Sequence, residues 1–295
     1  MVSHRAGKLV INQLTIIGVG LIGGSLARAL KRAGAVGEIV GSGRDVDHLQ
    51  RALASGVIDR AEPDMATAVQ GADMVLVAAP VGAMEAIFRA IAPTLPTDAV
   101  LTDAGSTKAS VVEAAKKVFG ELPPNFVPGH PIAGTEKSGV EASFAELYDG
   151  RRVILTPTEN SAPEAVNRVR DMWQQAGAEV VETSISHHDE ILAATSHLPH
   201  LLAFSLVDTL ATMDDKQEIF EFAAGGFRDF TRIASSDPQM WHDICAHNGP
   251  SLLKMLERFE ADLDKLRQAI ANGDSDYLLQ VFTRAKSARD QFCDD

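Results

Sequence analysis

The sequence predicts an α/β fold with a mostly parallel sheet, followed by an all-α C-terminal domain. Short β-type runs alternate with helical stretches over residues 14–183, which is typical of a parallel sheet covered by helices. The turn Gly18-Val-Gly20-Leu-Ile-Gly23 follows the first run and opens a helix, as in Rossmann-type domains. No β-rich run appears after this region, and helical stretches continue toward the C-terminus. We therefore predict a Rossmann domain over residues 1–184 and a helical domain over residues 185–295.

The expected elements are short and carry the usual boundary signals. Several helices end at Gly or start near Pro, as helices commonly do. The expected strands cover residues 14–17, 38–40, 74–77, 99–102, 126–127, 153–155 and 179–181. The expected helices of the first domain cover residues 21–33, 46–54, 81–91, 108–119 and 163–175.

The helical domain has three recognisable helix starts. Ser186 and Asp189 are spaced like a capping box, which predicts that a long helix begins there. We expect Pro199 to kink this helix, because proline removes a backbone donor and clashes with the preceding turn. The pairs Asp237-Pro238 and Gly249-Pro250 mark two further starts, since proline is favoured in the first helical turn.

Composition and charge exclude several classes of protein. The 295 residues are 45% hydrophobic and 23% charged, an ordinary globular composition rather than that of a disordered chain. The net charge of −13 disfavours nucleic acid and anionic lipid as partners, so an anionic substrate would need local cations. Cys245 and Cys293 lack metal-ligand spacing and suit a reducing compartment. With neither a signal-peptide pattern nor 18 uninterrupted apolar residues, we expect a cytoplasmic protein.

The glycine turn predicts a dinucleotide site. Gly18 permits the tight turn, Gly20 lets the backbone approach a pyrophosphate, and Gly23 lets helix and strand pack closely. The helix then presents its first amides and its dipole to the anion, so we expect Leu21 and Ile22 to contribute to the site as well. The alternative is a glycine-rich turn without a ligand.

The end of the second strand favours NADP over NAD. An NAD-selective site places an Asp or Glu there against the ribose 2′-hydroxyl, whereas this chain has Ser42 and Gly43 followed by Arg44. Ser42 is an expected cofactor contact, and Arg44 is available to bind a 2′-phosphate. In the alternative, Arg44 is a solvated charge and Asp45 binds the ribose. Ala79 and Pro80 complete the expected cofactor-binding residues.

Two later segments supply candidate catalytic residues. Ligands of open α/β sheets bind beyond the carboxyl ends of the strands, and Ser106 follows the strand 99–102 there. The alternative for Ser106 is a helix N-cap hydroxyl. His130 follows the next strand, in Gly129-His130-Pro131, where a histidine is suited to take a proton during an alcohol oxidation.

The helical domain contributes histidines and arginines. His197 and His200 share one helix face, but no Cys, His or carboxylate partner at ligand spacing accompanies them, so we expect no metal site. Arg228 and Arg232 are four residues apart and, on a helix, would meet a carboxylate from one face. The alternative is a solvated ion-pair face with Asp229.

Together these segments resemble the prephenate and arogenate dehydrogenase family, also called cyclohexadienyl dehydrogenases. The resemblance runs in family order over residues 14–285, and two of its strings, GHPIAGTE and FRDFTRIA, are specific to the family. The matching segments are Gly18 to Ser25, Asp103 to Lys108, Gly129 to Glu136, Ser196 to His200 and Phe227 to Ala234.

The resemblance implies an oxidative decarboxylation that makes tyrosine precursors. A ring with a hydroxyl and a carboxylate loses hydride to NAD(P) and carbon dioxide to solution, and aromatisation makes the reaction irreversible. His130 would accept the proton of the ring hydroxyl, Ser106 would orient that hydroxyl, and Arg232 would bind the ring carboxylate. Supporting roles in substrate binding would fall to His197, His200, Glu136 and Trp241. Arg228 would favour a keto-acid side chain by its charge.

The resemblance also implies a homodimer formed through the helical domain. Many family members carry an Asp where Gly43 stands, which adds to the preference for NADP. No room for an appended regulatory domain is left after Phe292, so tyrosine inhibition is expected to act at the active site. The choice between prephenate and arogenate stays open.

Two rival functions are weighed against this one. A β-hydroxyacid or imine-type dehydrogenase also joins a Rossmann domain to helices, but the hydroxyacid group relies on a lysine where this chain has Ser186-His187-His188-Asp189. A non-catalytic NAD(P)-sensing protein would reuse the fold without needing His130, Ser106 and Arg232 together.

Overall fold

The computed structural model describes residues 11–292. Residues 1–10, which include most of the segment assessed for a signal peptide, lie outside this range, and so does Cys293. The chain forms two compact units, one ending at Gly249 and one beginning at Pro250, and each is described separately below. The division into functional domains at residues 184 and 185 stays a prediction.

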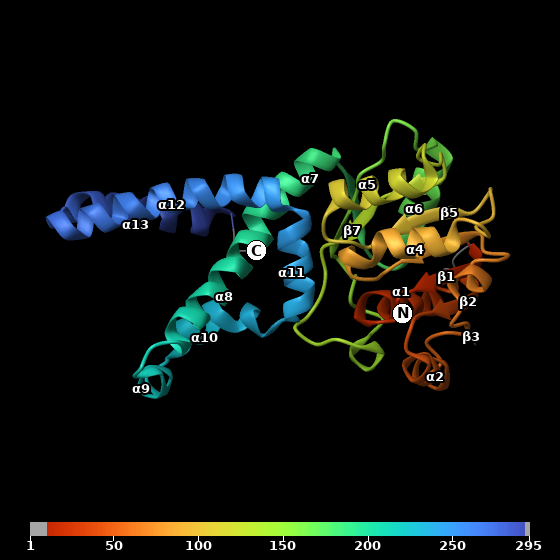
Figure 1. The fold of residues 1–295 in the computed structure, drawn as a ribbon, viewed down its shortest axis with the longest axis horizontal. Coiled ribbons are helices and arrows are strands. Elements are labelled where there is room, and N and C mark those ends of the chain that lie inside the picture. The colour runs from red at the N-terminus through yellow and green to blue at the C-terminus, as the bar shows by residue number, and fades with distance from the viewer. Residues whose placement is uncertain (1–10, 293–295) are drawn as a thin grey trace, which may run out of the picture. The chain divides into compact units, whose positions relative to one another are not determined.

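A six-stranded parallel sheet forms the centre of the first unit (Figure 1). Its strand order is β3-β2-β1-β4-β5-β6, the order of a Rossmann fold, so the predicted fold class is confirmed. The register aligns Ile17 with Ser42 and Val77, and Val77 with Asp103, so four strands end at one edge. The strands are β1 (Ile11–Ile17), β2 (Val36–Ser42), β3 (Arg60–Ala61), β4 (Met74–Val77), β5 (Val100–Asp103) and β6 (Phe126–Val127).

Helices cover both faces of this sheet, and each face has its own apolar core. One core includes Leu26 and Leu30 of α1 with Trp173 of α6, and the other includes Phe88 of α4 with Val111 of α5. This double cover explains why the strands read as continuous apolar runs. The helices are α1 (Leu21–Ala33), α2 (Val46–Ala54), α3 (Met65–Ala68), η1 (Val81–Ala83), α4 (Met84–Ile91), α5 (Lys108–Phe119) and α6 (Pro163–Gln175).

The last predicted strands belong to a second, three-stranded sheet, so the expectation of one sheet was wrong. This sheet consists of β7 (Gly129–Pro131), β8 (Arg152–Leu155) and β9 (Glu179–Glu182), with β7 antiparallel and β9 parallel to β8. The break comes at Pro128, which has no N–H to continue the ladder from the two-residue strand β6. A single 3₁₀ turn, η2 (Val140–Ala142), interrupts the long loop between β7 and β8.

Helices are the only regular elements of the described chain after β9, as predicted. In the first unit they are α7 (Ile185–Leu192), η3 (Ala193–His197), α8 (Leu198–Ala211), α9 (Lys216–Glu221), α10 (Gly225–Thr231), η4 (Arg232–Ser235) and α11 (Pro238–His247). The irregularity expected at Pro199 is a π-helical turn, η3, which immediately precedes the first turn of α8. Asp237 caps α11 through the backbone N–H of Met240, as its sequence predicts.

The helical stretch Ile185–Ala211 is long and apolar enough to cross a membrane by length and composition alone. However, its Asp189 is buried and accepts hydrogen bonds from the backbone of α5. The stretch is therefore an integral helix of the folded first unit.

The second unit contains most of α12 (Gly249–Asn272) and all of α13 (Ser275–Phe292). Several of its large apolar side chains are exposed in the single chain, among them Leu253, Ile270, Leu279 and Phe282. Surface of this kind on two neighbouring helices is typical of a protein interface.

Candidate active site

Asp103, at the end of β5, organises the carboxyl edge of the sheet. Its carboxylate accepts the N–H of Gly105 at 2.7 Å and the N–H of Gly129 at 3.2 Å. The same carboxylate pairs with the ammonium of Lys108, which also donates to the carbonyl of Gly129 at 2.6 Å. Both charged side chains are fully buried. The ion pair therefore holds both backbone groups of the residue that precedes His130.

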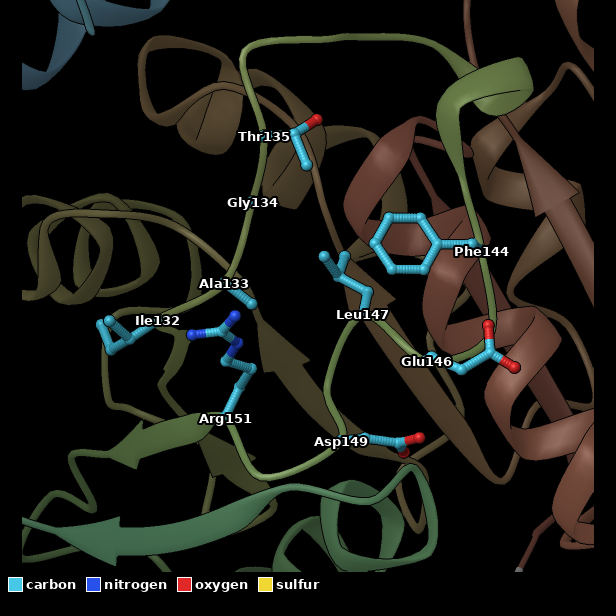
Figure 2. Close-up of a pocket in the computed structure, with 9 residues that line it drawn as sticks. All are labelled: Ile132, Ala133, Gly134, Thr135, Phe144, Glu146, Leu147, Asp149 and Arg151. Carbon is cyan, nitrogen blue, oxygen red and sulfur yellow. The ribbon is translucent and has the colours of Figure 1, made fainter. Parts of the chain in front are cut away.

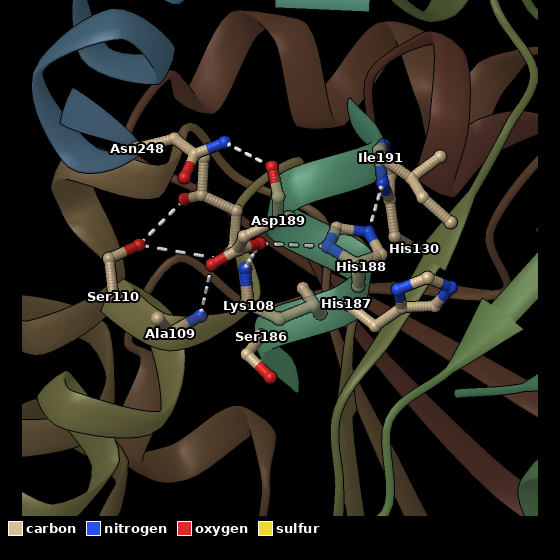
Figure 3. Close-up of polar contacts among 12 residues, drawn as sticks. Lys108, Ala109, Ser110, His130, Ser186, His187, His188, Asp189, Ile191 and Asn248 are labelled. Atoms are coloured by element: carbon tan, nitrogen blue, oxygen red, sulfur yellow. Dashed lines mark hydrogen bonds and ion pairs between the residues drawn. The ribbon is translucent and has the colours of Figure 1, made fainter. Parts of the chain in front are cut away.

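Asp189 joins α7 to the start of α5 (Figure 3). Its carboxylate accepts the N–H of Lys108 at 2.8 Å and the N–H of Ala109 at 2.9 Å, amides that have no partner within their own helix. The predicted capping box was therefore wrong, because Ser184 caps α7 while Asp189 caps a different helix. Burial acts to raise the pKa of Asp189, but these bonds and one from His188 outweigh burial and lower it.

His130 lies at the end of a hydrogen-bonded chain that begins at Asp189. His188 Nδ1 lies 2.8 Å from the Asp189 carboxylate, and His188 Nε2 lies 2.9 Å from His130 Nδ1. All three residues are buried. Burial is the main cause that lowers the pKa values of His130 and His188, so both rings favour the neutral form.

The chain fixes which nitrogen of His130 carries a proton. A carboxylate only accepts, so the neutral His188 ring carries its proton on Nδ1 and accepts on Nε2. His130 must then donate from Nδ1, which leaves its Nε2 with a free lone pair. No partner for that nitrogen is found among residues 11–292. His130 is thus arranged to accept a proton from a ligand.

Ser106 lies beside the same edge and is half-buried. The N-cap of α5 is Thr107, not Ser106, so the alternative interpretation of Ser106 as an N-cap was wrong. Its hydroxyl has no partner in the described part of the chain, which leaves it available to a ligand.

A second polar group surrounds Trp241 of α11. The ring of His200 stacks on Trp241 with centroids 3.6 Å apart, and His197 meets it edge-on at 6.2 Å. Asn248 donates to the carbonyl of Asp189 at 2.8 Å and to His197 Nδ1 at 3.0 Å, so His197 carries its proton on Nε2. The buried indole N–H of Trp241 has no partner among the described residues, which is unusual for an interior donor.

Arg232 connects the helical part with the loop that follows His130. Its guanidinium lies 3.6 Å from the Glu136 carboxylate, and both side chains are largely exposed. Burial lowers the pKa of His200, and the nearby charge of Arg232 lowers it further. Arg228, by contrast, is exposed on α10 with no partner in the described chain, and Arg232 begins the 3₁₀ turn η4.

The dinucleotide turn is shaped for a ligand. A Cβ on Gly18 would meet the carbonyl oxygen of Ala78 at 2.4 Å, and one on Gly23 would meet that of Gly18 at 2.4 Å. A Cβ on Gly20 would meet nothing within 4 Å, so packing does not explain this glycine. The open space lies at the uncapped start of α1, beside Leu21 and Ile22. The turn therefore fits a pyrophosphate.

The end of β2 provides further groups beside this turn. Ser42 is fully buried and its hydroxyl has no partner among the described residues. Asp45 caps α2 by accepting the N–H of His48 at 3.0 Å. Arg44 is exposed, and no partner for it is found in residues 11–292. Ala79 and Pro80 follow β4, where Pro80 precedes the turn η1.

Comparison with known proteins agrees with this architecture. Residues 26–182 match the family model for the nucleotide-binding domain of prephenate dehydrogenase, and residues 184–284 match the model for its dimerization domain. The cyclohexadienyl dehydrogenase of Zymomonas mobilis is 42% identical over 285 residues, which cover 95% of this chain and 96% of that protein.

Two solved structures are also similar. The prephenate dehydrogenase of Aquifex aeolicus, in complex with hydroxyphenyl propionate and NAD+, has a TM-score of 0.88 at 38% identity and covers 95% of this chain and 98% of its own. The arogenate dehydrogenase of Synechocystis has a TM-score of 0.79 at 27% identity and covers 95% and 99%. The chain belongs to the prephenate dehydrogenase family. It is therefore an oxidoreductase of tyrosine biosynthesis, as the sequence motifs predicted.

Within this prephenate dehydrogenase fold, sequence reasoning missed three polar residues. His188, Asp189 and Asn248 form the buried connection between His130 and His197. Apart from the bond between the adjacent His188 and Asp189, their partners are 51 to 81 positions away in sequence, so no local spacing reveals them. The usable signal was the adjacent His188-Asp189 pair, which was interpreted as part of a capping box.

A cavity of about 420 Å³ lies beside the loop after β7 (Figure 2). It is lined by Ile132, Ala133, Gly134 and Thr135 from the start of this loop and by Phe144, Glu146, Leu147, Asp149 and Arg151 from its end. None of the predicted site residues lines it. The polar clusters around His130 and Trp241 belong instead to the carboxyl edge of the sheet and to the helices α7, η3, α8 and α11.

The buried histidines predict how stability depends on pH. Burial lowers the pKa of His197 to about 4 from an ordinary value of 6.5. The unfolded chain therefore binds more protons between these values, and the unfolding free energy should fall as the pH is lowered from 6.5 toward 4. The lowered pKa values of His130, His188 and His200 act in the same direction.

Urea unfolding at pH 7 and pH 5 measures this effect. His197→Gln keeps an acceptor for Asn248 but cannot take up the proton, so its loss of stability between the two pH values should be smaller than that of the wild type. His242→Gln, at an exposed ring on α11, is the control and should behave like the wild type. Equal pH dependence in His197→Gln and the wild type would contradict this account.

Proposed function

We propose that this chain catalyses the oxidative decarboxylation of prephenate or arogenate, giving 4-hydroxyphenylpyruvate or tyrosine, with NADP preferred over NAD. The observation that carries the proposal is the free Nε2 of His130, which the Asp189-His188 chain leaves as a proton acceptor. The solved relative from A. aeolicus holds hydroxyphenyl propionate and NAD+, which supports an aromatising substrate and a nicotinamide dinucleotide.

The first domain would hold the dinucleotide. Gly18, Gly20 and Gly23, with the first amides of α1 at Leu21 and Ile22, form a cradle for its pyrophosphate. Ser42 would reach the ribose, and Ala79 and Pro80 would border the site beyond β4. When bound, the nicotinamide ring supplies the acceptor for the hydride that leaves the substrate ring.

His130 would act as the base at the ring hydroxyl. As the carbon bearing the hydroxyl loses hydride, Nε2 of His130 takes the hydroxyl proton and the carbon–oxygen bond gains double-bond character. The carbon–carbon bond to the ring carboxylate then breaks and carbon dioxide leaves. The electron pair of that bond moves through the ring toward the oxygen and makes the ring aromatic, and the oxygen takes the proton back from His130 to give the phenol. The imidazolium is stabilised because His130 still donates its Nδ1 proton to His188, which in turn donates to the carboxylate of Asp189. Ser106, with its unpaired hydroxyl, would orient the substrate hydroxyl.

Arg232 would bind the ring carboxylate. Its contact with Glu136 is 3.6 Å, longer than a hydrogen bond, so its donors remain available to a ligand. The unpaired N–H of Trp241 and the Nε2 proton of His197 are further donors for an anionic substrate. His200 would hold the Trp241 ring by stacking, and Arg228 would add positive charge for a keto-acid side chain.

Three features support NADP. Arg44 has a free guanidinium beside the end of β2 and is therefore able to meet a 2′-phosphate. Asp45, the alternative ribose ligand, is engaged in capping α2. A Cβ on Gly43 would meet only Leu49, at 3.9 Å, so the backbone leaves space for the phosphate. The NAD+ in the A. aeolicus relative makes this preference the part of the proposal to test first.

We also propose that the protein is a cytoplasmic homodimer. Residues 184–284 match a dimerization domain, and the exposed apolar side chains Leu253, Ile270, Leu279 and Phe282 would be covered by a second copy. A β-hydroxyacid dehydrogenase is disfavoured, because α7, where that class relies on a lysine, instead places His188 beside His130.

Initial rates with each pair of prephenate or arogenate and NADP or NAD test the proposed function. We expect turnover with at least one substrate and a higher kcat/KM with NADP. Arg44→Gln should raise KM for NADP without raising KM for NAD. Arg60→Gln, an exposed arginine paired with Glu38, is the control and should change neither. Absence of turnover with all four pairs would reject the function, and equal effects of Arg44→Gln on both cofactors would reject the NADP preference.

Two substitutions should separate chemistry from substrate binding. His130→Asn removes the base and should lower kcat by about 10²- to 10⁴-fold, while the dissociation constant of the dinucleotide stays unchanged. Arg232→Gln should mainly raise KM, because losing a charged partner of a carboxylate costs about 2 to 5 kcal/mol. Steady-state kinetics and fluorescence titration of the dinucleotide measure both. A His130→Asn variant with wild-type kcat would rule out the assigned base.

A further inference from the structure

We propose that Lys108 is a positioning residue for His130. The side chain and the backbone N–H of this lysine both belong to one closed circuit of hydrogen bonds and covalent links that includes His130. The inference rests on the proposed role of His130 as the base. It assigns to the fully buried Asp103–Lys108 ion pair a part in the reaction beyond stabilising the fold.

The side chain of Lys108 holds the backbone before His130. Its ammonium donates to the carbonyl of Gly129 at 2.6 Å, and its partner Asp103 accepts the N–H of Gly129 at 3.2 Å. With both of its polar groups fixed, the Gly129 backbone cannot rotate independently of β5. A Cβ at Gly129 would also meet the carbonyl oxygen of Asp103 at 3.2 Å, so the two segments lie in close contact.

The backbone of Lys108 holds the other side of the His130 ring. Its N–H donates to Asp189 Oδ1 at 2.8 Å, the same oxygen to which His188 Nδ1 is bonded at 2.8 Å. His188 then meets His130 Nδ1 at 2.9 Å. The circuit therefore runs from the Lys108 ammonium through Gly129, His130, His188 and Asp189 back to the Lys108 amide. A displacement of Lys108 moves both supports of the ring.

Lys108 also acts on His130 by its charge. Burial is the main cause of the lowered pKa of His130, and repulsion from Lys108, and from His188 when His188 is protonated, lowers it further. Lys108 lowers the pKa of His188 in the same way. Burial lowers the pKa of Lys108, and the carboxylate of Asp103 opposes this effect. The ammonium paired with Asp103 disfavours a second positive charge on His130 before the reaction. The charged and titratable groups that face His130 are Lys108 of α5, Asp103 of β5, His188 and Asp189 of α7, and His197 of η3.

A buried ion pair of this kind is not needed for stability alone. Replacing both members by uncharged groups of similar size is often neutral, whereas removing one member leaves a costly unpaired charge. The double variant Asp103→Asn/Lys108→Met keeps an acceptor for the Gly129 amide and leaves no unpaired charge at these two positions. It therefore separates the positioning role from the structural one, even if Lys108→Met alone fails to fold.

The test compares Lys108→Met and the double variant with Lys116→Met, which replaces an exposed lysine of the same helix. We expect the double variant to fold and to bind the dinucleotide normally, with kcat lowered about 10- to 100-fold, since small misplacements of a catalytic group have effects of this size. The acidic limb of the kcat/KM profile of Lys108→Met should move to higher pH, because this variant loses the cation that lowers the pKa of His130 but keeps the Asp103 carboxylate. In the double variant both charges leave together, so the limb should move less. Lys116→Met should match the wild type.

An NMR titration of His130 in the same proteins does not depend on turnover. A larger rise in the pKa of His130 in Lys108→Met than in the double variant supports the inference even if the substrate proposed above is wrong. A folded double variant with wild-type kcat would overturn it, and so would a His130 titration that is the same in Lys108→Met as in the wild type.

Discussion

The arrangement of polar groups around His130 depends on the carboxylate of Asp189. It replaces the missing cap of α5, and through the same oxygen it orients His188 and so the ring of His130. Because Asp189 belongs to α7, the helical part and the sheet are joined by a charged contact rather than by apolar packing alone. A charge-assisted contact to backbone amides is directional, which suits a site where one ring nitrogen must face a substrate.

The parts of the fold that depend on local sequence were predictable. The turn from Gly18 to Gly23 predicts a Rossmann domain, because Gly18 and Gly23 leave no room for a Cβ and Gly20 faces open space that suits a ligand. His130 and Ser106 became candidates because they follow strands whose carboxyl ends meet at one edge. The resemblance to the family then supplied the reaction, which no periodicity in the sequence contains.

Other features depend on contacts between distant residues, and sequence reasoning missed them. Pro128 ends one sheet and the chain starts another, but the pairing partner of β7 lies more than twenty residues further along. Asp189 and Lys108 are 81 positions apart, so the spacing of Ser186 and Asp189 suggested a local cap that does not exist. The role of Lys108 is invisible in sequence for the same reason, since its partners come from three different elements.

The hydrogen bonds from Asp189 through His188 leave Nε2 of His130 unprotonated and free to accept a proton. Nitrogen-15 NMR of the histidine side chains, assigned with His130→Asn, reports the tautomer directly at neutral pH. We expect a neutral His130 ring with its proton on Nδ1. In Asp189→Asn, where His188 loses its carboxylate partner, we expect the distribution of the proton between the two ring nitrogens of His130 to change. A wild-type His130 protonated on Nε2, or present as the imidazolium, would contradict it.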